Sequence, residues 1–195
     1  MYSCLPCLVW VIGLRDNHPQ KRPAKSRKRW PSCLTTPGPH HAYQASLVGT
    51  WAFQDKTLPF VKGTLVRTAI FEGCFFQVEI TGGQLQIPIA DGKTKLANYQ
   101  GLEMEGYDNV SKSYVTTAIN NHIGSDEARQ IGQYDAQTNA FMYEWERELL
   151  PGLKQKNRKV LHLIDPNQYS EEYYEDQNGS LKKTRELIYT KTMAK

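Results

Sequence analysis

From residue 47 to the end of the chain, short stretches in which every second residue is apolar follow one another between turn-forming residues. Successive side chains of a β-strand point to opposite faces, so this alternation predicts strands that bury one face. In one stretch, for example, Phe76, Val78 and Ile80 alternate with polar side chains. The stretches are residues 50–54, 64–71, 74–81, 84–89, 100–107, 112–120, 128–134, 140–148, 159–164, 169–175 and 182–192. We therefore expect an all-β chain of about ten strands.

The connections between these stretches are short and contain residues that accept the left-handed backbone conformations of tight turns. Gly82 and Gly83 are expected to form one such turn, and residues 107–112, 134–139 and 177–180 three more. Strands joined in this way are antiparallel neighbours, and a flat sheet of ten strands would expose its two edges. Since closure removes both edges, we predict an up-and-down β-barrel. A short helix over residues 41–48 is expected before the first strand.

The first 42 residues differ in composition from the rest of the chain. Six of the ten prolines lie in residues 1–39, and residues 1–40 contain seven Lys and Arg against one Asp. Proline interrupts regular elements, and so few apolar side chains cannot offset the entropy lost on ordering the segment. We predict that residues 1–42 are a disordered, basic, proline-rich extension and that residues 43–195 form the barrel domain.

The composition and the N-terminal segment also limit the class of protein. Hydrophobic residues make up 39% of the chain and charged residues 23%, and no apolar stretch approaches twenty residues, so no membrane span is expected. The apolar run at residues 5–14 has the length of a signal-peptide core but lacks a preceding basic residue and a cleavage pattern. We expect a cytoplasmic protein, with export as the alternative. Residues 21–30 are basic and would attract phosphates without reading a sequence, so no specific nucleic-acid partner is expected.

The signatures of common enzyme and metal sites are absent from the sequence. It contains no Gly-rich phosphate loop, no nucleophile elbow and no histidine pair at helical metal-ligand spacing. Cys4, Cys7 and Cys33 fall in the proline-rich extension, where no folded core would fix a metal geometry. We expect no cofactor and no metal, and a protein that is not an enzyme.

Several short motifs resemble those of a known superfamily. Gly49-Thr50-Trp51 at the head of the first strand resembles the opening G-x-W of the lipocalins and other calycins. A largely bacterial calycin-like family, designated only as a domain of unknown function, is similar over roughly residues 43–195. The residues that carry this second resemblance are Gly106-Tyr107-Asp108-Asn109, Lys112, Tyr114, Val115, Tyr134-Asp135, Ile164-Asp165, Glu186, Tyr189, Thr190 and Lys191.

The resemblance implies a calycin-type barrel whose interior is packed with side chains or holds one small ligand. It also implies that Trp51 packs across the closed end of the barrel beneath a basic residue of the last strand, here Lys191. Both residues would then be structural. The chain departs from the family at Ala118, where an aromatic residue is usual, and at Lys191, where arginine is usual.

Two strands carry aromatic and polar side chains on one face, which is the usual composition of a small-molecule site. Tyr114, Thr116 and Asn120 share a face of one strand with an alanine. Tyr143 and Trp145 share a face of another with a phenylalanine and an arginine. If these faces point inward, they form an aromatic cavity. If they point outward, the alternate residues fill the core instead, and the alternation leaves both possibilities open.

Three further strand residues carry charged or titratable side chains. Arg67 could anchor a carboxylate through two parallel hydrogen bonds, or it could be a solvated strand arginine. His162 alternates with Val160 and Ile164, which predicts a buried face and permits a haem ligand or a general base. Lys159 is expected to pair across a hairpin with the exposed carboxylates of residues 144–148.

Acidic residues crowd one of the last hairpins. Glu171, Glu172, Glu175 and Asp176 are interleaved with three tyrosines, and this pattern predicts a charged outer face in water. Paired carboxylates for acid and base catalysis are the alternative.

The function expected from these features is binding of a small apolar molecule in the barrel interior, by a monomer or homodimer. The candidate ligand-binding residues are Arg67, Tyr114, Thr116, Asn120, Tyr143, Trp145 and His162. One alternative is a haem-binding barrel or a barrel enzyme that uses His162. The other is a fully packed barrel that acts as an interaction module.

Overall fold

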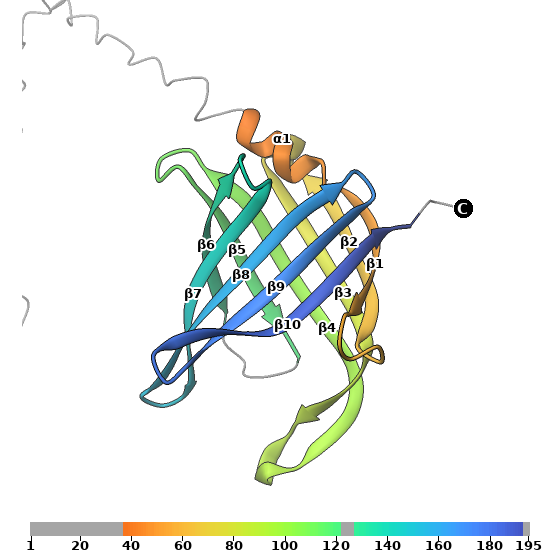
Figure 1. Ribbon diagram of the computed structural model, residues 1–195, viewed down its shortest axis with the longest axis vertical. Coiled ribbons are helices and arrows are strands. Elements are labelled where there is room, and N and C mark those ends of the chain that lie inside the picture. Colours follow the sequence, from red (N-terminus) through yellow and green to blue (C-terminus); the bar gives the residue numbers. More distant parts are fainter. Residues whose placement is uncertain (1–36, 122–126, 193–195) are drawn as a thin grey trace, which may run out of the picture. The chain divides into compact units, whose positions relative to one another are not determined.

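The computed structural model describes residues 37–121 and 127–192, which form a closed barrel (Figure 1). In these residues a short helix precedes ten strands, and each strand pairs antiparallel with both of its neighbours. The elements are α1 (Pro39–Ala45), β1 (Gly49–Asp55), β2 (Lys62–Ile70), β3 (Phe75–Pro88), β4 (Thr94–Asp108), β5 (Ser113–Asn120), β6 (Ala128–Asp135), β7 (Ala140–Leu150), β8 (Leu153–Asp165), β9 (Gln168–Gln177) and β10 (Ser180–Lys191). The predicted all-β class and up-and-down order of strands are confirmed.

The barrel closes between its first and last strands. β1 pairs with β10 through Trp51 and Lys191 and through Phe53 and Tyr189, and it pairs with β2 on its other side. Every strand therefore has a hydrogen-bonded neighbour along both edges, which is how a sheet of this size avoids exposing unpaired backbone groups.

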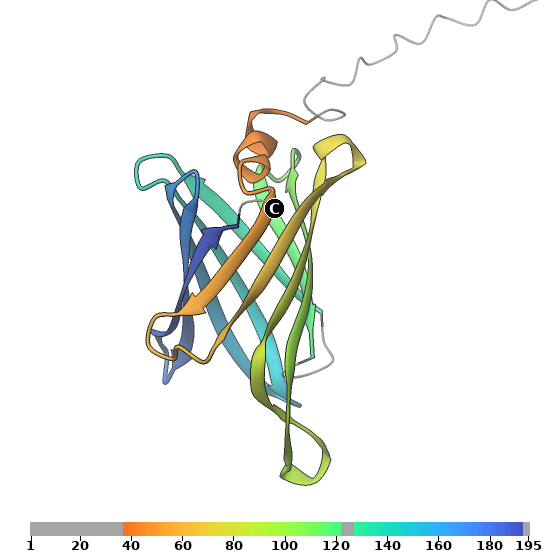
Figure 2. The same ribbon diagram turned by 90° about the vertical axis from the view of Figure 1, so that its right-hand side faces the viewer.

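The predicted turn at Gly82 and Gly83 is wrong, because β3 continues through both glycines to Pro88. The pairing with β4 shifts register between Thr81 and Gln84, so the glycines lie at an irregularity within a strand. A Cβ on Gly82 would lie 2.9 Å from the Cβ of Tyr99. Close packing thus explains this glycine. The chain instead reverses at Ala90–Gly92, and the long β3–β4 hairpin extends beyond the other strands (Figure 2).

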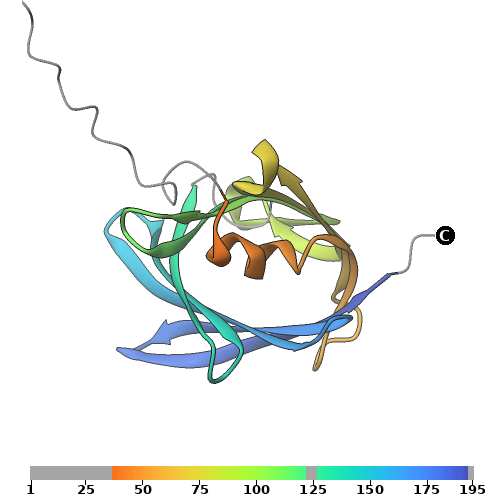
Figure 3. The same cartoon turned by 90° about the horizontal axis from the view of Figure 1, so that it is seen from above.

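Helix α1 lies across one end of the barrel (Figure 3). The ring of His40 stacks on Tyr107 at 4.2 Å, and the hydroxyl of Tyr114 donates a hydrogen bond to the carbonyl of His40 at 3.2 Å. The helix therefore begins inside residues 1–42, which the composition assigned to the extension. Its contacts place aromatic side chains at this end of the interior.

Some predictions fall on parts of the chain outside the described residues. These include most of the basic extension, with Cys4, Cys7 and Cys33. Cys74, in contrast, is described and is half-buried, just before β3. Across residues 37–121 and 127–192, none of the helices combines the length and the apolar character needed to span a membrane.

Candidate functional site

A cavity of about 280 Å³ lies inside the barrel at the end opposite α1. Its walls come from the late part of β3, the early part of β4 and the strand ends that meet at the same side of the barrel. The apolar and aromatic walls include Phe53, Leu85, Ala118, Trp145, Tyr173 and Leu187, and the polar lining includes Asn120, Gln130, Arg147, Asn157, Glu103 and Arg185. A mixture of aromatic walls with a few polar groups is typical of small-molecule sites.

The two faces that the alternation left undecided point inward. Tyr114, Thr116 and Ala118 of β5 are buried, whereas Ile119, which follows them on the opposite face, is 48% exposed. On β7, Phe141 is buried too, at 1% exposed. The barrel interior is therefore built from the aromatic faces.

The predicted ligand-binding residues do not all meet at the cavity. Asn120 and Trp145 line it. Tyr114, Thr116 and Tyr143 are buried in the interior but are not among its lining residues, and Tyr114 packs beneath α1. The hydroxyl oxygen of Thr116 is buried without a hydrogen-bond partner. The structure thus separates an aromatic core near α1 from a cavity at the other end.

Arg67 is buried, but its carboxylate partner belongs to the same chain. The guanidinium Nε and Nη2 donate to the two carboxylate oxygens of Glu105 at 2.9 and 3.0 Å. Glu105 is also buried, and Nη1 of Arg67 lies 3.4 Å from the carbonyl oxygen of Leu47. Both sequence interpretations of Arg67 are therefore corrected: the arginine is neither solvated nor free to hold a ligand's carboxylate.

Lys159 lies in the interior, and the prediction that it pairs with the exposed carboxylates of β7 is wrong. Its ammonium is 3.7 Å from a carboxylate oxygen of Glu103 and 3.8 Å from one of Glu171. The exposed carboxylates of β7 pair with other cations, for example Glu144 with Arg158 at 2.6 Å. Burial lowers the pKa of Lys159, but the carboxylates of Glu103 and Glu171 outweigh it and raise this pKa above its ordinary value.

Glu171 is also buried, so it does not belong to the charged outer face that was predicted for this segment. It accepts hydrogen bonds from the hydroxyls of Tyr173 at 2.6 Å and Tyr189 at 2.9 Å. Its neighbour Glu172 lies on the other face of β9 and pairs with Lys183 at 3.1 Å. Tyrosine hydroxyls from β9 and β10 therefore take the place of water around this buried carboxylate.

The interior ionic cluster comprises two cations, Arg67 and Lys159, and three carboxylates, Glu103, Glu105 and Glu171. Burial raises the pKa of Glu103, although the ammonium of Lys159 lowers it. A raised pKa at this position reduces the excess negative charge that the cluster would otherwise carry. Glu103 also lines the cavity, so the cluster forms part of the cavity wall.

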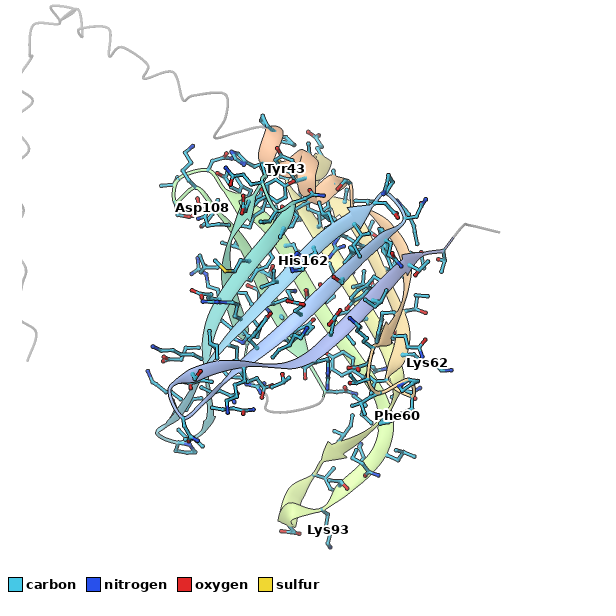
Figure 4. All side chains as sticks on the ribbon, viewed as in Figure 1. Tyr43, Phe60, Lys62, Lys93, Asp108 and His162 are labelled. Carbon is cyan, nitrogen blue, oxygen red and sulfur yellow. The ribbon has the colours of Figure 1, made fainter. Side chains whose placement is uncertain are left out.

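His162 is on the outer face of β8, and the prediction of a buried histidine is wrong (Figure 4). Its side chain is 39% exposed, and Nε2 lies 3.7 Å from a carboxylate oxygen of Glu172. The inward residues of this part of β8 are instead Lys159 and Leu161, because the strand has the opposite phase to the one expected. The interior haem or catalytic role based on His162 therefore has no support.

Trp51 and Lys191 lie together as the resemblance implied. The Lys191 ammonium is 5.2 Å from the centre of the Trp51 ring, and the indole N–H donates to the carbonyl of Leu47 at 2.9 Å. Gly49 has φ 136°, and a Cβ there would lie 2.9 Å from Cε of Lys191. The glycine thus leaves room for the lysine stem above the buried indole.

Replacing Lys191 with methionine is expected to lower the free energy of unfolding by about 0.5–1 kcal/mol, because methionine covers the indole without the cation. Arginine at the same position should preserve the stability, since guanidinium also stacks on aromatic rings. Urea titration of the three proteins measures the effect. Equal stability of the methionine variant and the unchanged protein would show that the cation contributes nothing.

The fold and the cavity define an antiparallel ten-stranded β-barrel with an internal site and a mixed aromatic and polar lining. Residues 36–191 match the family described as Protein of unknown function (DUF1579), and the chain belongs to that family. No curated protein matches the chain. In the described part of the chain, no group of three or more His, Cys, Asp and Glu side chains is placed to hold a metal ion.

Proposed function

We propose that this protein is a lipocalin-like barrel of the calycin superfamily and that it binds a small, largely apolar molecule in the interior cavity. The observation that carries the proposal is the volume of about 280 Å³ that side chains leave unfilled inside the barrel. This volume is close to the lower end of the range of about 300–1,000 Å³ for ligand pockets. A compact ligand with one to three rings suits it.

The lining supports an apolar ligand body. Phe53, Leu85, Ala118 and Leu187 supply hydrocarbon surface, and Trp145 supplies an aromatic face. Apolar surface that water covers in the free protein would be removed from water on binding, which contributes about 25 cal/mol per Å². The cavity also argues against the alternative of a fully packed barrel that acts as an interaction module, since such a barrel has no need of an unfilled interior.

Replacing Ala118 with phenylalanine tests this proposal, because Ala118 is buried and lines the cavity. A phenyl ring there would occupy ligand space. The neutral fluorescent probe N-phenyl-1-naphthylamine is expected to bind the unchanged protein with increased emission. The affinity of the variant for the probe should be lower by about tenfold or more.

Thr117→Phe is the matched control, since Thr117 directly precedes Ala118 in the same strand and points to the opposite face. This control should retain the probe affinity of the unchanged protein, and thermal unfolding should show that both variants are folded. No probe binding to the unchanged protein, or equal losses in both variants, would contradict binding in the cavity.

A further inference from the structure

Arg147 is the cavity-lining cation that lacks a partner. It lies on the inward face of β7, two residues beyond Trp145, and its Nε atom is buried with no hydrogen-bond acceptor. Among the described residues, no carboxylate forms an ion pair with its guanidinium. A buried donor that is left unsatisfied destabilises the folded protein, so an acceptor supplied by a ligand would offset that cost.

Two of the other charged groups in the lining, Glu103 and Arg185, have ion-pair partners in the same chain. Glu103 faces Lys159 at 3.7 Å, and Arg185 faces Asp55 at 3.7 Å. Glu175 also lines the cavity without an ion pair, but its carboxylate oxygens are not among the buried unpartnered atoms. Water can therefore hydrate Glu175, whereas it does not reach Nε of Arg147. The cavity lining therefore lacks a hydrogen-bond acceptor for Nε of Arg147.

Two glutamines on the strands beside β7 have buried side-chain carbonyl oxygens that lack a hydrogen-bond donor. Oε1 of Gln130, which lines the cavity, and Oε1 of Gln155, which pairs with Arg147 across the β7–β8 ladder, are both buried without a donor. Gln155 could accept one hydrogen bond from Arg147 after a rotation. A guanidinium has five N–H donors, so a single amide oxygen leaves most of them available.

We propose that the ligand of this cavity is a compact carboxylic acid with a planar apolar body, and that Arg147 binds its carboxylate. This inference rests on the proposed function. The guanidinium fork matches a carboxylate through two parallel hydrogen bonds, and the ring lies against Trp145. A hydroxyl on the ligand donates to Oε1 of Gln130. Arg147 thereby takes the role that the sequence offered for Arg67, whose fork Glu105 already occupies.

Three probes test the inference. Each has a benzene ring with a phenol hydroxyl, and they differ in the charge of the substituent opposite that hydroxyl. They are 4-hydroxybenzoate, 4-hydroxybenzyl alcohol and 4-hydroxybenzylamine, titrated by calorimetry at pH 7. The benzoate is expected to bind about 10- to 100-fold more tightly than the alcohol, in line with hydrogen bonds to charged groups. The amine should bind no more tightly than the alcohol.

The variant Arg147→Met keeps the aliphatic stem and removes the charge. It should bind the benzoate and the alcohol equally, and Arg147→Lys should retain part of the preference as a point charge. Arg158→Met is the matched control, because Arg158 lies on the neighbouring strand and pairs with the exposed Glu144. That control should keep the full preference, and thermal unfolding should show that each variant is folded.

The outcomes separate this inference from the proposed function. If N-phenyl-1-naphthylamine binds in the cavity but the benzoate has no advantage over the alcohol, the ligand is not an acid. If the benzoate keeps its advantage in Arg147→Met, Arg147 does not bind the carboxylate. Both results overturn this inference and leave the apolar site standing. If the amine binds most tightly and Glu175→Gln abolishes that binding, the recognised group is a cation at Glu175. If neither the naphthylamine nor any benzene probe binds, both proposals are overturned.

Discussion

Replacing Glu105 with glutamine is expected to lower the free energy of unfolding by about 3–5 kcal/mol. Glutamine keeps the shape of the side chain but leaves the guanidinium of Arg67 charged and buried without its carboxylate. Burial alone lowers the pKa of Arg67, and the charge of Glu105 outweighs this and raises it, so Glu105 compensates a buried guanidinium that stays charged in its absence. Urea unfolding followed by tryptophan fluorescence measures the loss.

The control is Glu144→Gln, which removes a carboxylate from the exposed pair with Arg158. An exposed pair contributes about 0–1 kcal/mol, so this variant should unfold close to the unchanged protein. The double variant Arg67→Met with Glu105→Leu should recover most of the lost stability, because apolar residues of similar volume remove both desolvated charges. A loss no larger for Glu105→Gln than for Glu144→Gln would contradict the buried ion pair.

Replacing Lys159 with methionine is expected to cost about 3–5 kcal/mol at pH 7. The variant leaves the carboxylates of Glu103 and Glu171 in the interior without the ammonium that lies 3.7 and 3.8 Å from them. Glu171 still accepts two tyrosine hydroxyl hydrogen bonds. Because Glu171 keeps these hydrogen bonds, loss of the Lys159 ammonium destabilises the charged form of Glu103 more than that of Glu171.

This second loss depends on pH in a direction that follows from Glu103. Its pKa is raised above 4.5 in the folded protein by burial, and removal of the Lys159 ammonium, which lowers it, raises it further. A carboxyl whose pKa is higher in the folded than in the unfolded state binds more protons in the folded state. Its contribution to the free energy of unfolding is therefore present at low pH and is lost as the pH rises. The difference between variant and unchanged protein should shrink as the pH falls from 7 toward 5.

Denaturant unfolding at several pH values measures this difference directly. Lys154→Met is the control, because its pair with Glu146 is exposed, and it should show no measurable change at any pH. A deficit for Lys159→Met that stays constant between pH 5 and 7 would show that Glu103 does not titrate in this range and would contradict the assignment.

Much of the fold was predictable because every strand of a closed barrel shows the same alternation of inward and outward residues and is joined to the next by a short connection. The alternation located the strands, and the turn residues gave their antiparallel order, which the barrel of β1 to β10 confirms. The error at Gly82 and Gly83 has a local cause. A glycine pair is typical both of a tight turn and of a strand position that another backbone or ring approaches closely, and here Tyr99 makes that approach.

The candidate site was less predictable, and β8 shows why. Val160, His162 and Ile164 alternate with Leu161 and Leu163, so both faces of the strand carry apolar side chains and the alternation does not distinguish them. The inward face holds Lys159, a residue that any hydrophobic pattern assigns to water. Only the carboxylates of Glu103 and Glu171, from β4 and β9, make that position favourable.

The sequence by itself determined that the chain is all-β, where most of its strands lie and which residues share a face, because these depend on the period-two geometry of a strand. The tertiary structure decided which faces point inward, that Arg67 is occupied by Glu105, and that Arg147 is left unpaired beside a cavity. These facts depend on distances between strands far apart in the chain. Closure of the barrel sets those distances, and the local pattern does not encode them.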